Sequence, residues 1–340
     1  MDKIVEYFNT KAVSNSLLRS LNNPRWIKIQ RDNPDTENED AAHFRMGATL
    51  DCLLTDPTRW DKEFIVVDAT RPYGFMGKFV DNLPSGLTEL SSQELYQEAY
   101  DKAGYRMAIN KVIDKFWSSE DIIKYYKLTR NIEKHKRILS KDEFDIVVKC
   151  KELIEANKFT KAYFVPENSN IEILYQVPIY FKYKDIDCKA LLDGIVIDHE
   201  NKTIQPYDLK TTKNISEFSV SYMMYGYYSQ CALYEVAIQT DSSPVKKYID
   251  KGYTILDFKF IAVENKLSST YPAIIFNTSK ADREKGLKGG EYKGKFYKGI
   301  DQLIEDYKIH TELDYWDLPM DLFFNNGIRQ LNVFDNDTKE

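Results

Sequence analysis

Two neighbouring stretches of this sequence have the composition of paired β-strands, and they constrain what the middle of the chain can fold into. Residues 190–197 form an apolar run interrupted by Asp193, and residues 203–209 lead into a second strand-like run. The five residues between them, Asp-His-Glu-Asn-Lys, are typical of a tight turn. The pattern predicts a β-hairpin whose strands are buried in a sheet.

This hairpin carries three charged side chains that we expect to meet at one edge of the sheet. Strand alternation points Asp208 and Lys210 to the same face, and the hairpin can bring Asp193 beside them. Two carboxylates and one ammonium group suit binding of a divalent cation and hydrolysis of a phosphodiester. The alternative interpretation is a surface hairpin with an ordinary Asp–Lys pair.

In the catalytic interpretation each residue has a separate role. Asp193 and Asp208 would be ligands of Mg²⁺, with the backbone carbonyl of Leu209 as a further ligand and Mn²⁺ as a substitute ion. Lys210 would position the attacking water and stabilise the charge that develops on the phosphate oxygens.

The order of these residues resembles that of a known nuclease superfamily. The pattern Asp193…Asp208-x-Lys210 is similar to the PD-(D/E)xK motif, and residues 187–193 followed by 207–212 resemble the phage exonuclease VIII (RecE)-like branch and the RecB-type nuclease domains. The resemblance also covers much of residues 14–67 and 172–276. It implies a restriction-endonuclease-like core, with a mixed central sheet flanked by helices, and cleavage of DNA.

Two further acidic residues become candidate metal ligands through this resemblance. RecB-type nucleases carry a helix with the pattern Gly-x-x-x-His; here Gly47 matches, and Asp51 stands in place of the His. An Asp can also bind a hard cation, so Asp51 is a candidate ligand, or else a polar residue on a helix surface. Glu172 falls where the branch has an acidic residue at the start of the preceding strand, and its alternative is a solvent-facing strand residue.

A helix rich in Tyr and Met is predicted after the hairpin, capped by Ser216 or Ser219 and running to about Gln239. Its Gln230 and Tyr234 resemble the Gln-x-x-x-Tyr motif of RecB-type nucleases. There, the Gln orients the catalytic Lys or the substrate, and the Tyr supports it. The alternative is that this helix belongs to the core, because Tyr and Met at helical spacing are common there.

Residues 280–298 interleave basic and aromatic residues with Gly and are predicted to form a loop. Such a segment can bind phosphates and stack an unpaired base. The candidate DNA-binding residues are Tyr234 and four lysines of this segment: Lys285, Lys288, Lys293 and Lys295. A solvated Gly-rich loop is the alternative.

The chain of 340 residues shows no clear linker. We predict a single α/β nuclease domain over 1–325, with a helical insertion at 85–160 and a polar C-terminal tail at 326–340. Within the insertion, helices are expected over 91–116, 119–132 and 141–157. No segment has the apolar length of a membrane span and the start does not resemble a signal peptide, so we expect a cytoplasmic protein, in the host cytoplasm if it is phage-encoded.

The net charge of −6 argues against a protein that coats DNA without specificity, although a local basic groove can still bind it. The sequence therefore favours a metal-dependent DNA nuclease, in particular an exonuclease that degrades linear double-stranded DNA from its ends in phage-type recombination or repair. The alternatives are a non-catalytic DNA-binding protein on the same fold and a structure-specific endonuclease. The resemblance also implies a single-strand annealing protein as partner and a homo-oligomer.

Overall fold

The computed structural model describes residues 3–32, 42–133 and 136–329, so most of the predicted tail at 326–340 lies outside the described residues. These residues form two compact units. Unit 1 contains residues 1–39, 158–262 and 274–340, and unit 2 contains residues 40–157 and 263–273. Among the helices that the structure describes, none is long and apolar enough to cross a membrane.

Unit 1 is built on a mixed sheet with the strand order β3-β4-β5-β7-β8, and β6 pairs with β5. The bounds are β3 (Ile171–Tyr183), β4 (Ile186–Asp198), β5 (Thr203–Thr212), β6 (Thr254–Ile255), β7 (Lys259–Glu264) and β8 (Ile274–Asn277). The pairs β3–β4, β4–β5 and β7–β8 are antiparallel, whereas β5 and β6 are parallel. The predicted α/β fold with a mixed central sheet flanked by helices is confirmed.

The predicted hairpin consists of β4, β5 and the turn between them. The side chain of Asp198 accepts hydrogen bonds from the backbone N–H groups of Glu200 and Asn201, both at 2.9 Å. Such an Asx-type arrangement replaces backbone pairing within the turn. Lys202 completes it with a positive φ of 52°.

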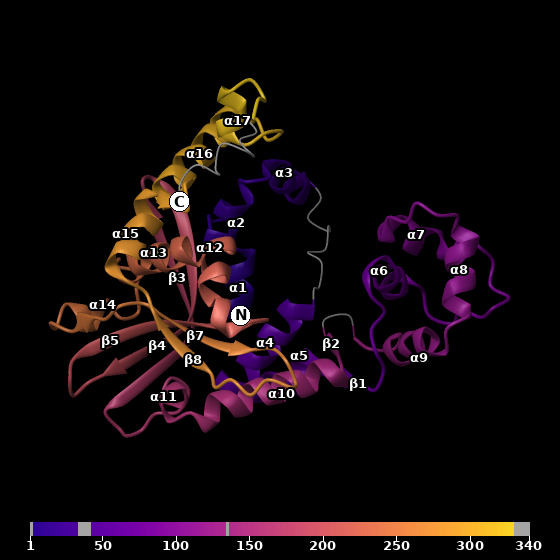
Figure 1. The fold of residues 1–340 in the computed structure, drawn as a ribbon, viewed down its shortest axis with the longest axis horizontal. Coiled ribbons are helices and arrows are strands. Elements are labelled where there is room, and N and C mark those ends of the chain that lie inside the picture. The colour runs from indigo at the N-terminus through magenta and orange to yellow at the C-terminus, as the bar shows by residue number, and fades with distance from the viewer. Residues whose placement is uncertain (1–2, 33–41, 134–135, 330–340) are drawn as a thin grey trace. The chain divides into compact units, whose positions relative to one another are not determined.

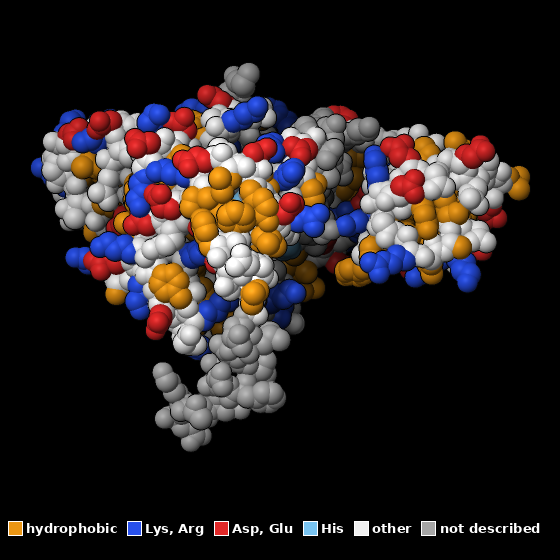
Figure 2. Space-filling view, turned by 90° about the horizontal axis from the view of Figure 1, so that it is seen from above, with side chains coloured by type: hydrophobic (Ala, Val, Ile, Leu, Met, Phe, Trp, Pro, Cys, Tyr) orange, Lys and Arg blue, Asp and Glu red, His pale blue; other side chains and the backbone are white. Residues whose placement is uncertain are grey.

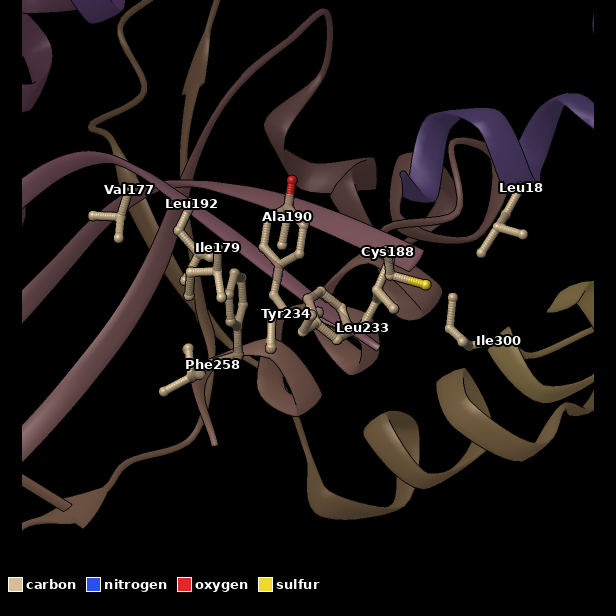
Figure 3. Packing of buried hydrophobic residues seen from close by; sticks show 14 of the residues in the cluster. Leu18, Val177, Ile179, Cys188, Ala190, Leu192, Leu233, Tyr234, Phe258 and Ile300 are labelled. Carbon is tan, nitrogen blue, oxygen red and sulfur yellow. The ribbon is translucent and has the colours of Figure 1, made fainter. Parts of the chain in front are cut away.

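Helix α13 (Tyr227–Ile238) packs on β3 and β4, and α2 (Asn15–Ser20), α15 (Lys280–Lys288) and α16 (Ile300–Leu313) pack around it (Figure 1). Most side chains of α13 are buried, as expected for a helix covered on nearly all sides. The core includes residues far apart in the sequence, among them Leu18, Ala190, Leu192, Leu233 and Ile300 (Figure 3). The remaining helices of unit 1 are α1 (Lys3–Asn9), α3 (Pro24–Asp32), α11 (Lys158–Lys161), α12 (Phe218–Met224), α14 (Lys246–Ile249) and α17 (Met320–Phe324).

Unit 2 is mainly helical. It contains α4 (Ala42–Thr55), α5 (Trp60–Glu63), α6 (Gly74–Asn82), α7 (Glu94–Ala103), α8 (Ile109–Trp117), α9 (Glu120–Thr129) and α10 (Lys141–Ala156), with a parallel pair of short strands, β1 (Phe64–Val67) and β2 (Arg137–Ser140). Its second core is aromatic, with Phe79, Tyr96 and Phe116 fully buried. The predicted helix over 91–116 is interrupted, because Gly104 adopts a left-handed conformation (φ 72°) that ends α7.

Two further predictions of secondary structure were wrong in unit 1. The helix expected to run to Gln239 breaks at Gly226, whose φ of 69° separates α12 from α13. The predicted loop at 280–298 is instead α15 followed by the hairpin of β9 (Gly290–Tyr292) and β10 (Lys295–Tyr297). Ser279 caps α15 by accepting a hydrogen bond from Asp282 N–H at 3.0 Å, and this favours a helix over a loop.

Candidate active site

Asp193 lies where the backbone pairing between β4 and β5 ends. The paired residues run from Asp198 and Thr203 to Gly194 and Tyr207. One residue further along β4, Asp193 Oδ2 accepts a hydrogen bond from the backbone N–H of Leu209 at 2.8 Å. The Asp193 carboxylate thus takes the place of a backbone carbonyl of β4 as the acceptor for Leu209 N–H. This hydrogen bond holds Asp193 next to the Asp208-Leu209-Lys210 segment of β5.

Gly194 allows this arrangement because the ring of Tyr207 crosses directly over it. A Cβ atom at residue 194 would lie 2.2 Å from Tyr207 Cζ, far inside contact distance. The Tyr207 hydroxyl donates a hydrogen bond to the Tyr163 carbonyl at 2.8 Å, which fixes the ring on this face. Alternation along β5 then directs Asp208 to the opposite face, toward α13.

Asp208 and Lys210 form a buried ion pair on that face. The Asp208 side chain is 2% exposed and that of Lys210 is 18% exposed. Gln230 of α13 donates a hydrogen bond from Nε2 to Asp208 Oδ1 at 2.8 Å. The structure therefore brings together Asp193, Asp208, Leu209, Lys210 and Gln230, all candidate site residues from the sequence.

Burial acts on the two charges of this pair in opposite ways. It raises the pKa of Asp208 above its ordinary value, against the lowering effects of Lys210 and Gln230. Burial lowers the pKa of Lys210, but the carboxylates of Asp208 and Asp193 outweigh it, so this pKa lies above its ordinary value. Lys210 is consequently held as an ammonium ion at neutral pH.

Two aromatic rings surround the Lys210 ammonium group. Its Nζ lies 4.7 Å from the centre of the Tyr227 ring and 5.9 Å from that of Phe260. These rings stack on each other, with centres 5.5 Å apart. Cation–π contacts of this kind favour the charged form and fix its position. Tyr227 and Phe260 were not among the candidate residues from the sequence, although Tyr227 shares a helix face with Gln230.

Tyr234 is part of the core and is not available to DNA. Its side chain is 8% exposed and packs edge-on against Phe258 at 6.0 Å (Figure 3). Burial, followed by the nearby Asp208 charge, raises its pKa well above the ordinary value, and Gln230 acts in the opposite direction. Tyr234 therefore packs in the core and does not lie at the surface, and the prediction that it binds DNA is corrected.

Glu172 does not join this set. It lies opposite Ile197, four residues along β4 from Asp193, which corresponds to roughly 13 Å along the strand. Its carboxylate accepts a hydrogen bond from the Tyr248 hydroxyl at 2.7 Å and pairs with His199 Nε2 at 3.1 Å. Glu172 thus binds side chains near the hairpin turn, and we correct its assignment as a metal ligand.

Asp51 belongs to α4 in unit 2. There its carboxylate lies 3.9 Å from Arg59 Nη1, and its side chain is 16% exposed. Its role as a metal ligand stays a prediction.

The four candidate DNA-binding lysines all lie in the α15 segment and the hairpin after it, and all are exposed: Lys285, Lys288, Lys293 and Lys295. On the face drawn in Figure 2, basic and acidic side chains of the described residues are mixed, without a wide area of one sign. Contacts with a polyanion would therefore depend on local clusters such as this one.

The candidate donors have the chemistry that a hard cation prefers. Asp193 and Asp208 would supply carboxylate oxygens, and the backbone carbonyl of Leu209 would add a third oxygen. Within the described ranges, no group of three or more His, Cys, Asp or Glu side chains could hold a metal ion. Mg²⁺ is usually bound by one or two carboxylates together with waters and substrate phosphates, so this pair suffices for Mg²⁺ but not for a closed zinc site.

Comparisons with known proteins assign no family. No protein-family model matches the sequence, and no curated protein matches it. Among solved structures, a Eubacterium rectale protein described as a candidate exonuclease is similar over 100% of this chain and 97% of its own, with 10% identity and a TM-score of 0.49. A likeness at this level assigns no function to the chain.

Proposed function

We propose that this protein is a metal-dependent DNA nuclease that hydrolyses phosphodiester bonds at the ends of linear double-stranded DNA. The observation that carries the proposal is the meeting of Asp193, Asp208, Lys210 and Gln230 where β4, β5 and α13 come together. A buried carboxylate beside an ammonium group and a second carboxylate costs stability, and such an arrangement is typical of catalytic sites.

In this proposal Asp193, Asp208 and the Leu209 carbonyl hold Mg²⁺, and Mn²⁺ can replace it. The bound ion would polarise a water molecule and neutralise charge on the scissile phosphate. Lys210, kept charged by its two carboxylate neighbours, donates hydrogen bonds to the attacking water and to a non-bridging phosphate oxygen. Gln230 fixes the orientation of the Asp208 carboxylate, and Tyr234 supports Gln230.

The preference for DNA ends and a role in phage-type recombination or repair follow from the sequence resemblance. So do a single-strand annealing partner, a homo-oligomer and a cytoplasmic location. The exposed lysines of the α15 segment and its hairpin would bind phosphates of the DNA. All of these belong to the proposal.

Digestion of matched linear and covalently closed circular duplexes tests the proposal. We expect loss of the linear DNA alone, with Mg²⁺ or Mn²⁺, and no loss in EDTA. Lys210→Met, which keeps an apolar stem against Tyr227 and Phe260, should be inactive. Lys182→Met is the matched control, because Lys182 is an exposed lysine on a strand of the same sheet, 73% exposed and paired with Asp187.

The other outcomes select the alternatives. Cutting of the closed circle would make the protein an endonuclease. DNA binding without cutting of either substrate would favour a non-catalytic DNA-binding protein on this fold. A Lys210→Met variant that cuts at the wild-type rate would contradict the site assignment.

A further inference from the structure

A pocket lined by tyrosines lies between the start of α13, α15 and the β9–β10 hairpin, all within unit 1. Four of its lining residues are Tyr222, Tyr228, Tyr292 and Tyr297. The ring centres of Tyr228 and Tyr297 are 6.2 Å apart, as are those of Tyr292 and Tyr297, and both pairs meet edge to face. The rings thus form a continuous aromatic wall and not a set of isolated surface tyrosines.

Charged groups of both signs stand at the rim of the pocket, and the lysines come mainly from the hairpin. Asp282, Lys285 and Glu291 also line the pocket, and all three are exposed. Lys293 Nζ lies 5.4 Å from the Tyr292 ring centre, and Lys295 Nζ lies 5.2 Å from that of Tyr297. Aromatic rings interleaved with lysines are the usual features of single-strand binding, in which bases stack and ammonium groups pair with phosphates.

The hairpin holds two of these tyrosines in defined positions. Its turn residues Lys293 and Gly294 both have positive φ, 47° and 71°, as a tight two-residue turn requires. Tyr292 and Lys295 are directly paired across the two strands. Two hydrogen bonds, both at 3.1 Å, hold the Tyr228 side chain in place. Its hydroxyl accepts one from Arg19 and donates one to the Lys298 carbonyl.

The pocket and the candidate active site share one helix start. Tyr227 contacts Lys210, and the next residue, Tyr228, lines the pocket. Tyr222 connects the two as well, since its ring centre lies 5.8 Å from that of Phe260, which also contacts Lys210. Both sites therefore lie beside the start of α13, so one bound strand could place a nucleotide in the pocket and a phosphate at the active site.

We propose that this pocket binds one unpaired nucleobase of a single-stranded DNA segment, and so gives the protein a preference for frayed or overhanging ends. The inference rests on the proposed function only in taking DNA as the polymer that is bound. The base would stack against Tyr292 and Tyr297, Lys285 would pair with its phosphate, and Glu291 would accept a hydrogen bond from an N–H group of the base, such as the ring N–H of thymine.

Metal-free binding tests this inference without any need for cleavage. Anisotropy of a fluorescent twelve-nucleotide oligo-dT and of a blunt duplex would be measured in EDTA at fixed salt. The double variant Tyr292→Ala/Tyr297→Ala should bind oligo-dT about tenfold or more weakly, and the duplex within about twofold of the wild type. The double Phe variant, which keeps both rings, should bind oligo-dT as the wild type does.

Tyr73→Ala, at a tyrosine that is 90% exposed in unit 2, is the matched control and should change neither affinity. An oligo-dT with abasic sites should bind the wild type more weakly, while the double Ala variant should no longer distinguish it from intact oligo-dT. Thermal unfolding of each variant shows whether the protein is still folded.

Two results would overturn the inference: wild-type affinity of a folded double Ala variant for oligo-dT, or an equal loss for oligo-dT and duplex. Either can occur while the protein still cuts linear DNA, in which case the proposed nuclease function stands. Conversely, selective loss of oligo-dT binding supports the pocket even where the wild type cuts nothing.

Discussion

Each unit buries an ion pair: Asp208 with Lys210 in unit 1, and Glu143 with Arg45 in unit 2. The two carboxylates differ in the other groups that they bind. In unit 2, Arg45 is 1% exposed and pairs with Glu143 at 2.6 Å. Glu143 also accepts a hydrogen bond from the Ser140 backbone N–H at 3.0 Å, in a capping box at the start of α10. The pair therefore connects α4 to the first turn of α10 and serves the fold.

In unit 1, the partners of Asp208 among the described residues are side chains only, Lys210 and Gln230. Within the described part of the chain no helix end or strand ladder depends on the Asp208 carboxylate, and burial raises its pKa. The contrast gives a criterion that can be tested. A structural buried charge satisfies backbone groups, whereas a charge of the kind proposed for Asp208 is held by side chains alone and is costly to bury.

The largest effect that separates the two pairs is expected for Lys210→Met. Loss of the ammonium group should reduce cleavage of linear DNA on the order of 10³-fold or more, because charge stabilisation in the transition state is lost. The thermal midpoint should fall less than for Arg45→Met, because burial already raises the pKa of Asp208, whose partners among the described residues are side chains only. Single-turnover kinetics measure the cleavage rate, and thermal unfolding measures the midpoint. A large loss of stability would instead mean that the Asp208–Lys210 pair has a structural role.

Arg45→Met should have the opposite profile. Removal of one partner leaves the buried Glu143 charge uncompensated and weakens the start of α10, at a cost of about 3–5 kcal/mol in the free energy of unfolding. Urea unfolding followed by circular dichroism would show a lower midpoint. An unchanged midpoint would remove the distinction between the two pairs.

A smaller effect is expected for Gln230→Ala. Without its hydrogen bond, the Asp208 carboxylate is less well oriented, so cleavage or Mn²⁺ affinity should fall about 10–100-fold. Titration of activity against Mn²⁺ concentration separates a loss of metal affinity from a loss of rate. Gln239→Ala, at the exposed end of the same helix, is the control and should match the wild type.

The smallest effect concerns an ion pair of unit 1 that lies outside the site. A hydrogen bond from Asn277 and the ion pair with Arg283 hold the pKa of Asp257 below its ordinary value of 3.8. A lowered pKa in the folded state stabilises it above pH 3.8, and this contribution is lost as the pH falls further. Because Asp257 is half-exposed, Asp257→Asn should cost only about 0.5–1 kcal/mol at pH 7.

Urea unfolding at pH 7 and near pH 3 tests this sign. The difference in the free energy of unfolding between wild type and Asp257→Asn should be smaller at the lower pH. If this difference were the same at both pH values, the charge of Asp257 would make no contribution to stability.

The sequence predicted what depends on local pattern. Asp193, Asp208 and Lys210 come together through one turn and strand alternation, both of which can be read from neighbouring residues. The position of Glu172 depends on the register of the longer hairpin of β3 and β4, which places the start of one strand beside the end of the other. The turn of this hairpin, at Lys184 and Asp185, is twelve residues from Glu172, so a position at the start of the strand does not show which residue of β4 lies opposite.

The incorrect predictions of secondary structure have a different physical cause. Gly226 reads as a tolerated glycine within a helix, yet a Cβ at this residue would lie 2.3 Å from Arg19 Nε, a residue more than two hundred positions earlier. The Gly and Lys content of residues 280–298 predicted a loop, although Ser279 before them can cap a helix. The burial of Arg283 against Glu235 and Asp257, which anchors α15, is a tertiary contact.

The core of unit 1 has a consequence for synthesis on the ribosome. It joins Leu18, near the beginning of the chain, to strand residues such as Ala190 and to Ile300 and Ile304. Proteins emerge from the ribosome N-terminal end first, and a core with such distant partners cannot close until the last of them is available. The residues around Lys210 are therefore translated well before the core that carries them is complete, because that core also needs Ile300 and Ile304.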